Sequence, residues 1–191
     1  VMVLLIVVIA VTGLLTAFHL RGGEDGNLGS LYKITAIPDN SLITPGQEGN
    51  VCTVTIVCDT VLDNLRTLDK EKAPYVPKDG VILPKTQVSF AQGDTAFDVL
   101  QRVSTAADIQ LEYSWTPMYD SSYIEGINHL YEFDCGKESG WMYKVNDWFP
   151  NYGCSSYKVE NGDNIVWCYT CNGYGEDVGS TWAATEGSSA E

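Results

Sequence analysis

The residue types in this chain that could support chemistry are six cysteines and two histidines, His19 and His129. Cys168 and Cys171 form a CxxC, but no second such pair is present and neither histidine lies at ligand spacing from it, so we expect no zinc site. An even number of cysteines in a chain with extracellular features indicates disulfides instead. The six candidates are Cys52, Cys58, Cys135, Cys154, Cys168 and Cys171.

Nucleophilic catalysis would need a histidine close to a serine, threonine or cysteine. His19 follows the apolar start of the chain, and His129 lies in GINHLYEF, where we expect a partly exposed strand histidine. No catalytic triad can be argued from these positions. We therefore expect no enzyme activity, no catalytic residues and no cofactor.

The charge balance restricts the possible partners. Twenty-five acidic residues against 11 basic ones give a formal net charge of −14, without a basic stripe. Phosphate binding depends on clustered lysines and arginines, so nucleic acid is not an expected partner. The acidic residues lack the EF-hand pattern, so we expect no calcium or other metal site.

Aromatic residues are the strongest candidates for binding, because flat amphipathic rings suit sugars, peptides and subunit contacts. Trp141, Tyr143 and Trp167 alternate within expected strands and are predicted to pack in the core. Three further rings lie in a turn bounded by proline and cysteine, where we expect exposure and contact with a surface ligand. They are Trp148, Phe149 and Tyr152.

The apolar stretch 1–18 has no charged residue, and as a helix it would reach about 27 Å, close to the thickness of a bilayer. It fits two hypotheses, a membrane anchor on a glycine-rich tether or a pilin-like helix that packs with copies of itself after removal of a leader. The layout resembles that of type IV pilins, although their usual glutamate at the fifth position is Leu5 here. The predicted assembly residues are Val1, Leu4, Leu5, Val8, Val11 and Leu15.

The soluble part reads as an α+β domain. Strands are predicted at 51–58 and 81–90 from their β-branched content and alternation. A helix follows, with Asp94 as N-cap, an Asp98–Arg102 pair and an apolar face that includes Phe97 and Leu100. The remainder, from residue 109, reads as strands and turns and ends in NIVWCYTC after a turn at 160–163. This order predicts one helix across a single mixed sheet.

The expected sheet suggests disulfide pairs, although six cysteines allow fifteen connectivities. If the last strand lies beside the first, Cys58 and Cys171 come close together. Cys135 and Cys154 flank the GWMYKVNDWF hairpin and could clamp it, and Cys52 and Cys168 remain.

The motifs GDTAFDVLQRV, GWMYKVNDWF and ENGDNIVWCYTC occur in this order, and the chain from about 51 to 178 closely resembles the transcobalamin C-terminal-like family of uncharacterised bacterial cell-surface domains. The resemblance implies a β-grasp-like fold and an extracellular setting, mostly in Gram-positive bacteria, but no activity. In animal vitamin B12 carriers the related domain forms a clamp with an α-helical barrel, which this sequence does not encode, so cobalamin is not expected. The family's VNG is VND here, and we expect the missing glycine to reshape the loop that carries Trp148.

The predicted organisation is therefore an N-terminal hydrophobic helix (1–21), a tether (22–50), a disulfide-stabilised β-grasp-like domain (51–178) and a polar tail (179–191). We expect a non-enzymatic structural or adhesive protein of the bacterial cell surface. Its first predicted function is a filament subunit whose partners are copies of itself and, during assembly, the membrane. The alternative is a membrane-anchored module that binds a small molecule or a glycan.

Overall fold

The computed structural model describes residues 41–42, 49–172 and 175–180, which belong to a compact unit of residues 34–191. The predicted hydrophobic helix, including all its assembly residues and His19, lies outside the described residues, as do most of the tether and the tail. Within the described residues, no helix has the length and apolar character needed to cross a membrane.

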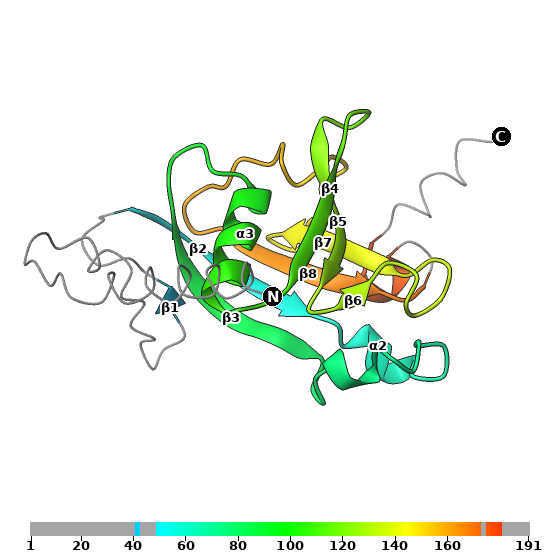
Figure 1. Ribbon diagram of the computed structural model, residues 1–191. Helices are drawn as coiled ribbons and strands as arrows, with labels where there is room; N and C mark the ends of the chain where they lie inside the picture. The colour runs from blue at the N-terminus through cyan, green and yellow to red at the C-terminus, as the bar shows by residue number, and fades with distance from the viewer. Residues whose placement is uncertain (1–40, 43–48, 173–174, 181–191) are drawn as a thin grey trace, which may run out of the picture. The chain divides into compact units, whose positions relative to one another are not determined.

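A five-stranded mixed sheet forms the centre of the unit, with strand order β1-β3-β2-β8-β7 (Figure 1). Its strands are β1 (Ser41–Leu42), β2 (Asn50–Val57), β3 (Val81–Phe90), β7 (Gly140–Val145) and β8 (Asn164–Thr170). Strand β8 pairs in parallel with β2, which confirms that the last predicted strand lies beside the first. Strand β1 and the first residue of β2 fall within the stretch predicted as tether.

The strands that follow the helix do not all join this sheet. Strands β4 (Leu111–Thr116), β5 (Ser121–Ile127) and β6 (Leu130–Tyr131) form a separate three-stranded sheet in that order. Asn128 and His129 both adopt left-handed φ values, of 53° and 63°, and turn the chain back so that β6 pairs with β5. The prediction of one sheet is therefore wrong, and so is the prediction of a continuous strand through His129. Turns between neighbouring strands allow β4, β5 and β6 to pair with one another and not with the five-stranded sheet. The α+β class holds.

Helix α3 (Ala96–Ala106) begins one residue later than predicted. Thr95, not Asp94, is the N-cap, and its side chain forms a reciprocal capping box with Asp98. Asp98 is thereby engaged at the helix start, and Arg102 instead forms an ion pair with Asp94 at 2.6 Å. The helix buries Val99, Leu100 and Val103 against the sheet.

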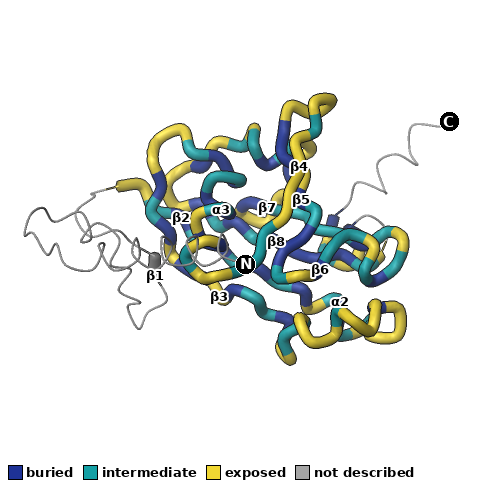
Figure 2. Tube along the Cα trace, in the orientation of Figure 1, coloured by how far each residue is buried: buried dark blue, intermediate teal, exposed yellow. Residues whose placement is uncertain are grey.

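The remaining helical segments are short. Helix α2 (Thr60–Asp63) follows β2, and 3-10 turns lie at Ala73–Tyr75 and Glu176–Val178. The core divides into two clusters of buried residues. Figure 2 shows that buried positions alternate with partly buried and exposed ones along the strands. The first lies between α3 and the five-stranded sheet and includes Ile56, Leu100 and Trp167. The second lies under α2 and includes Leu130 and Tyr169.

Candidate functional site

The candidate site is an apolar groove between the two sheets, made of two adjacent pockets of about 220 and 200 Å³. One wall is β5 at Tyr123, and the other is β7 at Trp141 and Tyr143. The third side is the loop 150–154. Tyr123 and Tyr152 line both pockets. We name this feature the aromatic groove.

The loop 150–154 is fixed to β5 by polar contacts. Ser155 N donates to Ser121 Oγ at 3.2 Å, and Ser122 N donates to Ser155 Oγ at 3.1 Å. The Cys154 thiol donates to Ser122 O at 3.4 Å. At Gly153 an added Cβ would lie 2.0 Å from Ser121 Oγ, so only glycine allows this close approach. The loop therefore holds a defined position against β5.

Exposed rings line the groove. Tyr123 is 47% exposed and Tyr152 is 44% exposed, and Tyr119 at the open end is more exposed still. Trp148 is 52% exposed and packs edge-on against Tyr152, with ring centroids 6.1 Å apart. The structure thus brings two of the three predicted contact residues, Trp148 and Tyr152, together beside the groove.

Phe149 does not share this exposure. Its side chain is only 8% exposed, and Lys144 Nζ lies 5.8 Å from its ring centroid. The expectation that Phe149 is exposed for contact is therefore wrong, because the chain turns this ring inward directly after Trp148. Tyr119 and Tyr123 belong to the chain's wider set of aromatic residues but are not among the three predicted contact residues. Tyr123 is exposed in a strand that buries its neighbours Ser122 and Ile124.

The turn before Trp148 retains a tight form without glycine. Asn146 and Asp147 have φ values of 51° and 64°, and Val145 and Trp148 exchange backbone hydrogen bonds of 2.8 and 2.9 Å. This is the geometry of a two-residue hairpin turn in which both central residues are left-handed. Asn146 secures it, since its Nδ2 donates to Asp163 Oδ1 at 2.8 Å. Replacement of the family's glycine by Asp147 therefore leaves the tight turn in place.

The deeper rings of the groove pack as predicted. Tyr143 stacks on Trp167 with centroids 5.4 Å apart, and its hydroxyl donates to Tyr152 O at 2.9 Å. Trp141 packs edge-on against Tyr169, and its Nε1 donates to Leu130 O at 2.8 Å. This last hydrogen bond joins β7 of one sheet to β6 of the other, which fixes the groove's walls relative to each other.

The electrostatics at the groove are negative. The Tyr123 hydroxyl donates to Glu132, and burial together with this carboxylate raises the pKa of Tyr123. Glu125 adds further negative charge nearby. Burial raises the pKa of the Cys154 thiol to about 11, so it is protonated at neutral pH.

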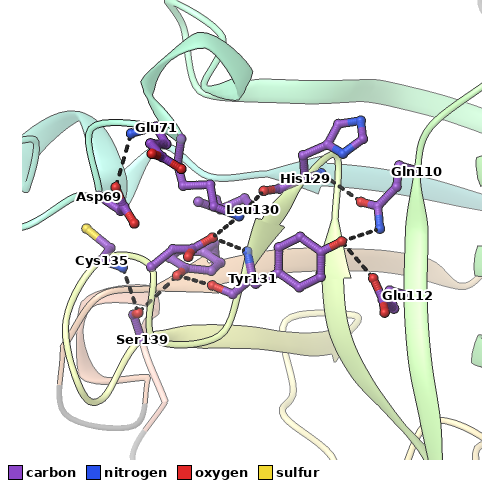
Figure 3. A network of polar contacts seen from close by, with 12 residues as sticks. Asp69, Glu71, Gln110, Glu112, His129, Leu130, Tyr131, Cys135 and Ser139 are labelled. Carbon is purple, nitrogen blue, oxygen red and sulfur yellow. Dashed lines mark hydrogen bonds and ion pairs between the residues drawn. The ribbon is translucent and has the colours of Figure 1, made fainter.

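A polar network surrounds β6 (Figure 3). The Tyr131 hydroxyl donates to Glu112 at 2.7 Å and accepts from Gln110 at 3.0 Å, and the hydrogen bond to Glu112 is the main reason that its pKa rises to about 12. Tyr131 O accepts from the buried Tyr169 hydroxyl at 2.6 Å, and that hydroxyl also lies 2.9 Å from Ser139 Oγ. These contacts tie the loop after β6 to β8.

His129 is not among the residues that line the groove; it lies in the turn between β5 and β6, where it is exposed and its ring centroid is 4.5 Å from that of Tyr75. Its place in a turn corrects the expected strand position. Its backbone N–H donates to Gln110 Oε1 at 2.7 Å, as Figure 3 shows. Across the described part of the chain, no group of three or more histidine, cysteine or acidic side chains is arranged to hold a metal ion.

The six cysteines are free thiols in the structure. Cys58 and Cys171 both lie at the second core cluster, as does Cys135. The structure does not bring Cys135 to Cys154, which belongs to the first cluster. Cys52 and Cys168 are also apart. Cys52 lies on the same face of β2 as Ile56, and Ile56 pairs with Trp167 of β8. Cys168 is the next residue of β8, so it points to the opposite face of the sheet.

Comparison with known proteins gives one family-model match and distant structural similarities. Residues 93–171 match the model of a domain of unknown function, DUF4430, and this region contains the hairpin and final strand that carry the sequence resemblance. A crystal structure of haptocorrin in complex with Cbi is similar at 15% identity and a TM-score of 0.45, over 65% of this chain and 26% of the haptocorrin chain. A candidate metal-binding protein from Ruminococcus gnavus is similar at 14% identity and a TM-score of 0.39, over 65% of this chain and 99% of that one. No curated protein matches the chain.

Proposed function

We propose that this domain is a non-enzymatic binding module of the cell surface, and that the aromatic groove takes a neutral glycan. The observation that carries the proposal is the pair of half-exposed rings, Tyr123 and Tyr152, which face the same two apolar pockets. Sugar rings present flat C–H faces that stack on aromatic side chains, and their hydroxyls need polar groups beside the rings. Asn151 and Thr116 line the outer pocket and supply such groups.

The size of the groove supports a small ligand or the end of a longer one. Its two pockets together offer roughly 400 Å³, near the lower end of the usual range for ligand sites. The walls are held by the contacts of the loop 150–154 and by the Trp141 hydrogen bond, so little ordering is needed on binding. A groove with fixed walls selects ligands by how well their shape fits it.

Charge favours a neutral ligand. Glu132 and Glu125 lie near Tyr123, and the whole chain carries a formal charge of −14. An anionic ligand would approach against this field, and an anion at the groove would lack a cationic partner among the residues that line it.

The lining residues also support binding without catalysis. Among the described residues, those that line the groove include no histidine and no carboxylate, and the one thiol, Cys154, has a pKa raised by burial to about 11. A general base or activated nucleophile would need a perturbation in the other direction.

Calorimetric titration of the full chain with neutral oligosaccharides, such as chito-, cello- and xylo-oligosaccharides, tests the proposal. We expect binding by at least one series, and Tyr152→Ala or Tyr123→Ala should weaken it about fivefold or more, because truncation of a central aromatic contact costs more than about 1 kcal/mol. Tyr75→Ala is the matched control, since Tyr75 is 41% exposed and lies outside the groove. Absence of binding by every series, or equal weakening by all three variants, would refute the proposed function.

The filament hypothesis remains a prediction, because it depends on residues 1–20. Electron microscopy of protein sheared from cells would detect filaments, and N-terminal sequencing of the same band would identify the first residue of the subunit. Dispersed protein would leave the groove proposal untouched and count against assembly.

A further inference from the structure

Two thiols from distant parts of the sequence lie together at the end of β8. Cys135 follows β6 and Cys171 directly follows β8, with about 35 residues between them. Both lie at the second core cluster, together with Leu130 and Tyr169. The loop that carries Cys135 is held there by backbone and side-chain contacts, since Cys135 N donates to Ser139 Oγ at 3.0 Å.

The segment around α2 contacts both sulfur atoms. Cys135 Sγ is 3.6 Å from Asn64 O and 3.6 Å from Thr67 Oγ1, and Cys171 Sγ is 3.6 Å from Thr60 Oγ1. Asn64 Nδ2 donates to Thr60 O at 2.8 Å, so these two anchor points are themselves connected. The Cys135 thiol is also among the groups that raise the pKa of Cys171, after burial, so the two thiols are neighbours.

Three of the other thiols have a different environment. Cys52, Cys154 and Cys168 contact backbone carbonyls, of Val88, Ser122 and Met142 respectively. Burial raises the pKa of each of these thiols, to about 12, 11 and 12, as it also raises that of Cys171, so what distinguishes these three is their contact with strand carbonyls. Cys58 lies in the second cluster and is the competing partner for Cys171.

We propose that Cys135 and Cys171 form a disulfide bond in the mature protein. Both sulfurs contact the same short segment around α2, and both cysteines lie in connections outside the strands, so closure requires no change in strand pairing. The geometry thus favours a pair that differs from the three that the sequence suggested. The inference does not depend on the ligand of the groove.

The chemistry is a thiol–disulfide exchange with an oxidised disulfide carrier of low molecular mass or an oxidised dithiol protein. The partly exposed Cys171 thiolate attacks one sulfur of the carrier, which forms a mixed disulfide and releases one carrier thiolate. The Cys135 thiolate then attacks Sγ of Cys171, forms the internal bond and releases the second carrier thiolate. Two cysteine thiols are oxidised, the carrier disulfide is reduced to two thiols, and the two protons pass to the released thiolates.

The bond would connect the loop after β6 to the end of β8. This loop starts at Glu132, the partner of the Tyr123 hydroxyl, and includes Ser139, the neighbour of the Tyr169 hydroxyl. A covalent link at Cys135 therefore restrains the segment that holds one wall of the aromatic groove. Restraint of the unfolded chain over a loop of about 35 residues should raise the midpoint of thermal unfolding.

Peptide mapping of the full chain, purified in mild detergent and equilibrated with oxidised glutathione, tests the proposal directly. Free thiols are alkylated under denaturing conditions, the protein is digested without reduction, and linked peptides are identified by mass spectrometry. We expect the Cys135 and Cys171 peptides to be linked and Cys52, Cys154 and Cys168 to be alkylated. A Cys58–Cys171 link, another pairing, or six alkylated cysteines would overturn the inference.

Thermal unfolding with and without reductant gives a second measurement. Reduction should lower the Tm of the wild-type protein by about 10 °C, and it should leave Cys135→Ala, Cys171→Ala and the double variant unchanged. Cys154→Ala is the matched control, because its Tm should still fall on reduction. Equal sensitivity to reductant in Cys135→Ala and the wild type would contradict the proposed bond, and the mapping of the wild type needs no variant to fold.

Discussion

Gly153 provides a sharp test of how the groove is built. A Cβ at this position would lie 2.0 Å from Ser121 Oγ and 2.2 Å from Ser121 Cβ, although its distance to Ser121 Cα would be an ordinary 3.7 Å. Gly153→Ala therefore introduces a purely side-chain collision between the loop 150–154 and β5. The loop has to move away from β5 by more than 1 Å, or Ser121 has to be displaced from its buried place.

The expected cost follows from these distances. Overpacking of a close contact typically costs about 1–3 kcal/mol, and the displacement would also strain the hydrogen bond from Ser155 N to Ser121 Oγ. We expect Gly153→Ala to destabilise the domain by about 2–3 kcal/mol. For a domain of roughly 130 residues this corresponds to a fall in Tm of about 10 °C.

Ser121 supplies the rescue. Ser121→Gly removes both colliding atoms, at a cost of about 2 kcal/mol for a glycine in a strand and the lost partner of Ser155 N. Ser121→Ala removes only Oγ and leaves the 2.2 Å contact with Cβ. In urea unfolding, the double variant Ser121→Gly/Gly153→Ala should therefore be about 2 kcal/mol more stable than the sum of the single effects, whereas Ser121→Ala should rescue little.

Strict additivity in this double-mutant cycle would refute the proposed steric coupling, because the two residues would then not compete for the same space. A wild-type stability for Gly153→Ala would refute it equally. If oligosaccharide binding is found, Gly153→Ala should also weaken it, and the double variant should recover part of that loss.

Three further changes probe the elements that position the groove. Asp147→Gly should raise the free energy of unfolding by about 0.5–1 kcal/mol in urea titration, because glycine relieves the left-handed backbone of the hairpin turn; a loss of stability would show that the Asp147 side chain stabilises the turn more than its backbone costs. Thr95→Ala should cost about 1 kcal/mol by the same assay, because it removes the cap shared with Asp98, and an unchanged midpoint would contradict that role. Burial alone would raise the pKa of Asp94, but the hydrogen bond and charge of Arg102 outweigh it and lower the pKa. The resulting stabilisation is complete above the unfolded-state pKa and is lost as the pH falls, so Asp94→Asn should lose less stability than wild type between about pH 5 and 3; parallel curves would rule out this linkage.

The strands and the long helix could be predicted because their signals are local. Alternating β-branched residues give β2 and β3 close to their observed bounds, and GDTAFD marks the start of α3. The error at the N-cap has a local cause as well. Asp94 and Thr95 are both good caps, and only the three-dimensional position of Arg102 shows that Asp94 is engaged in an ion pair.

The second sheet could not be predicted, because strand partners are decided by turns and packing over many residues. The sequence YIEGINHLYEF reads as one strand, yet Asn128 and His129 accept left-handed φ values and reverse the chain. Phe149 was misjudged for a related reason. Its exposure depends on the direction in which the chain leaves the Asn146–Asp147 turn, and composition does not encode that direction.

The aromatic groove depends on the unpredicted second sheet. In a single sheet each aromatic side chain would lie either in the core or in open solvent, and Tyr123 and Tyr152 would share no cavity. Because β5 belongs to a separate sheet that joins β7 through the Trp141 hydrogen bond, the space between the sheets is bounded on three sides and lined by rings. The binding proposal therefore depends on the arrangement of the two sheets. Any change that separates β6 from β7, such as loss of the Trp141 Nε1 donor, should affect the groove before it affects the core.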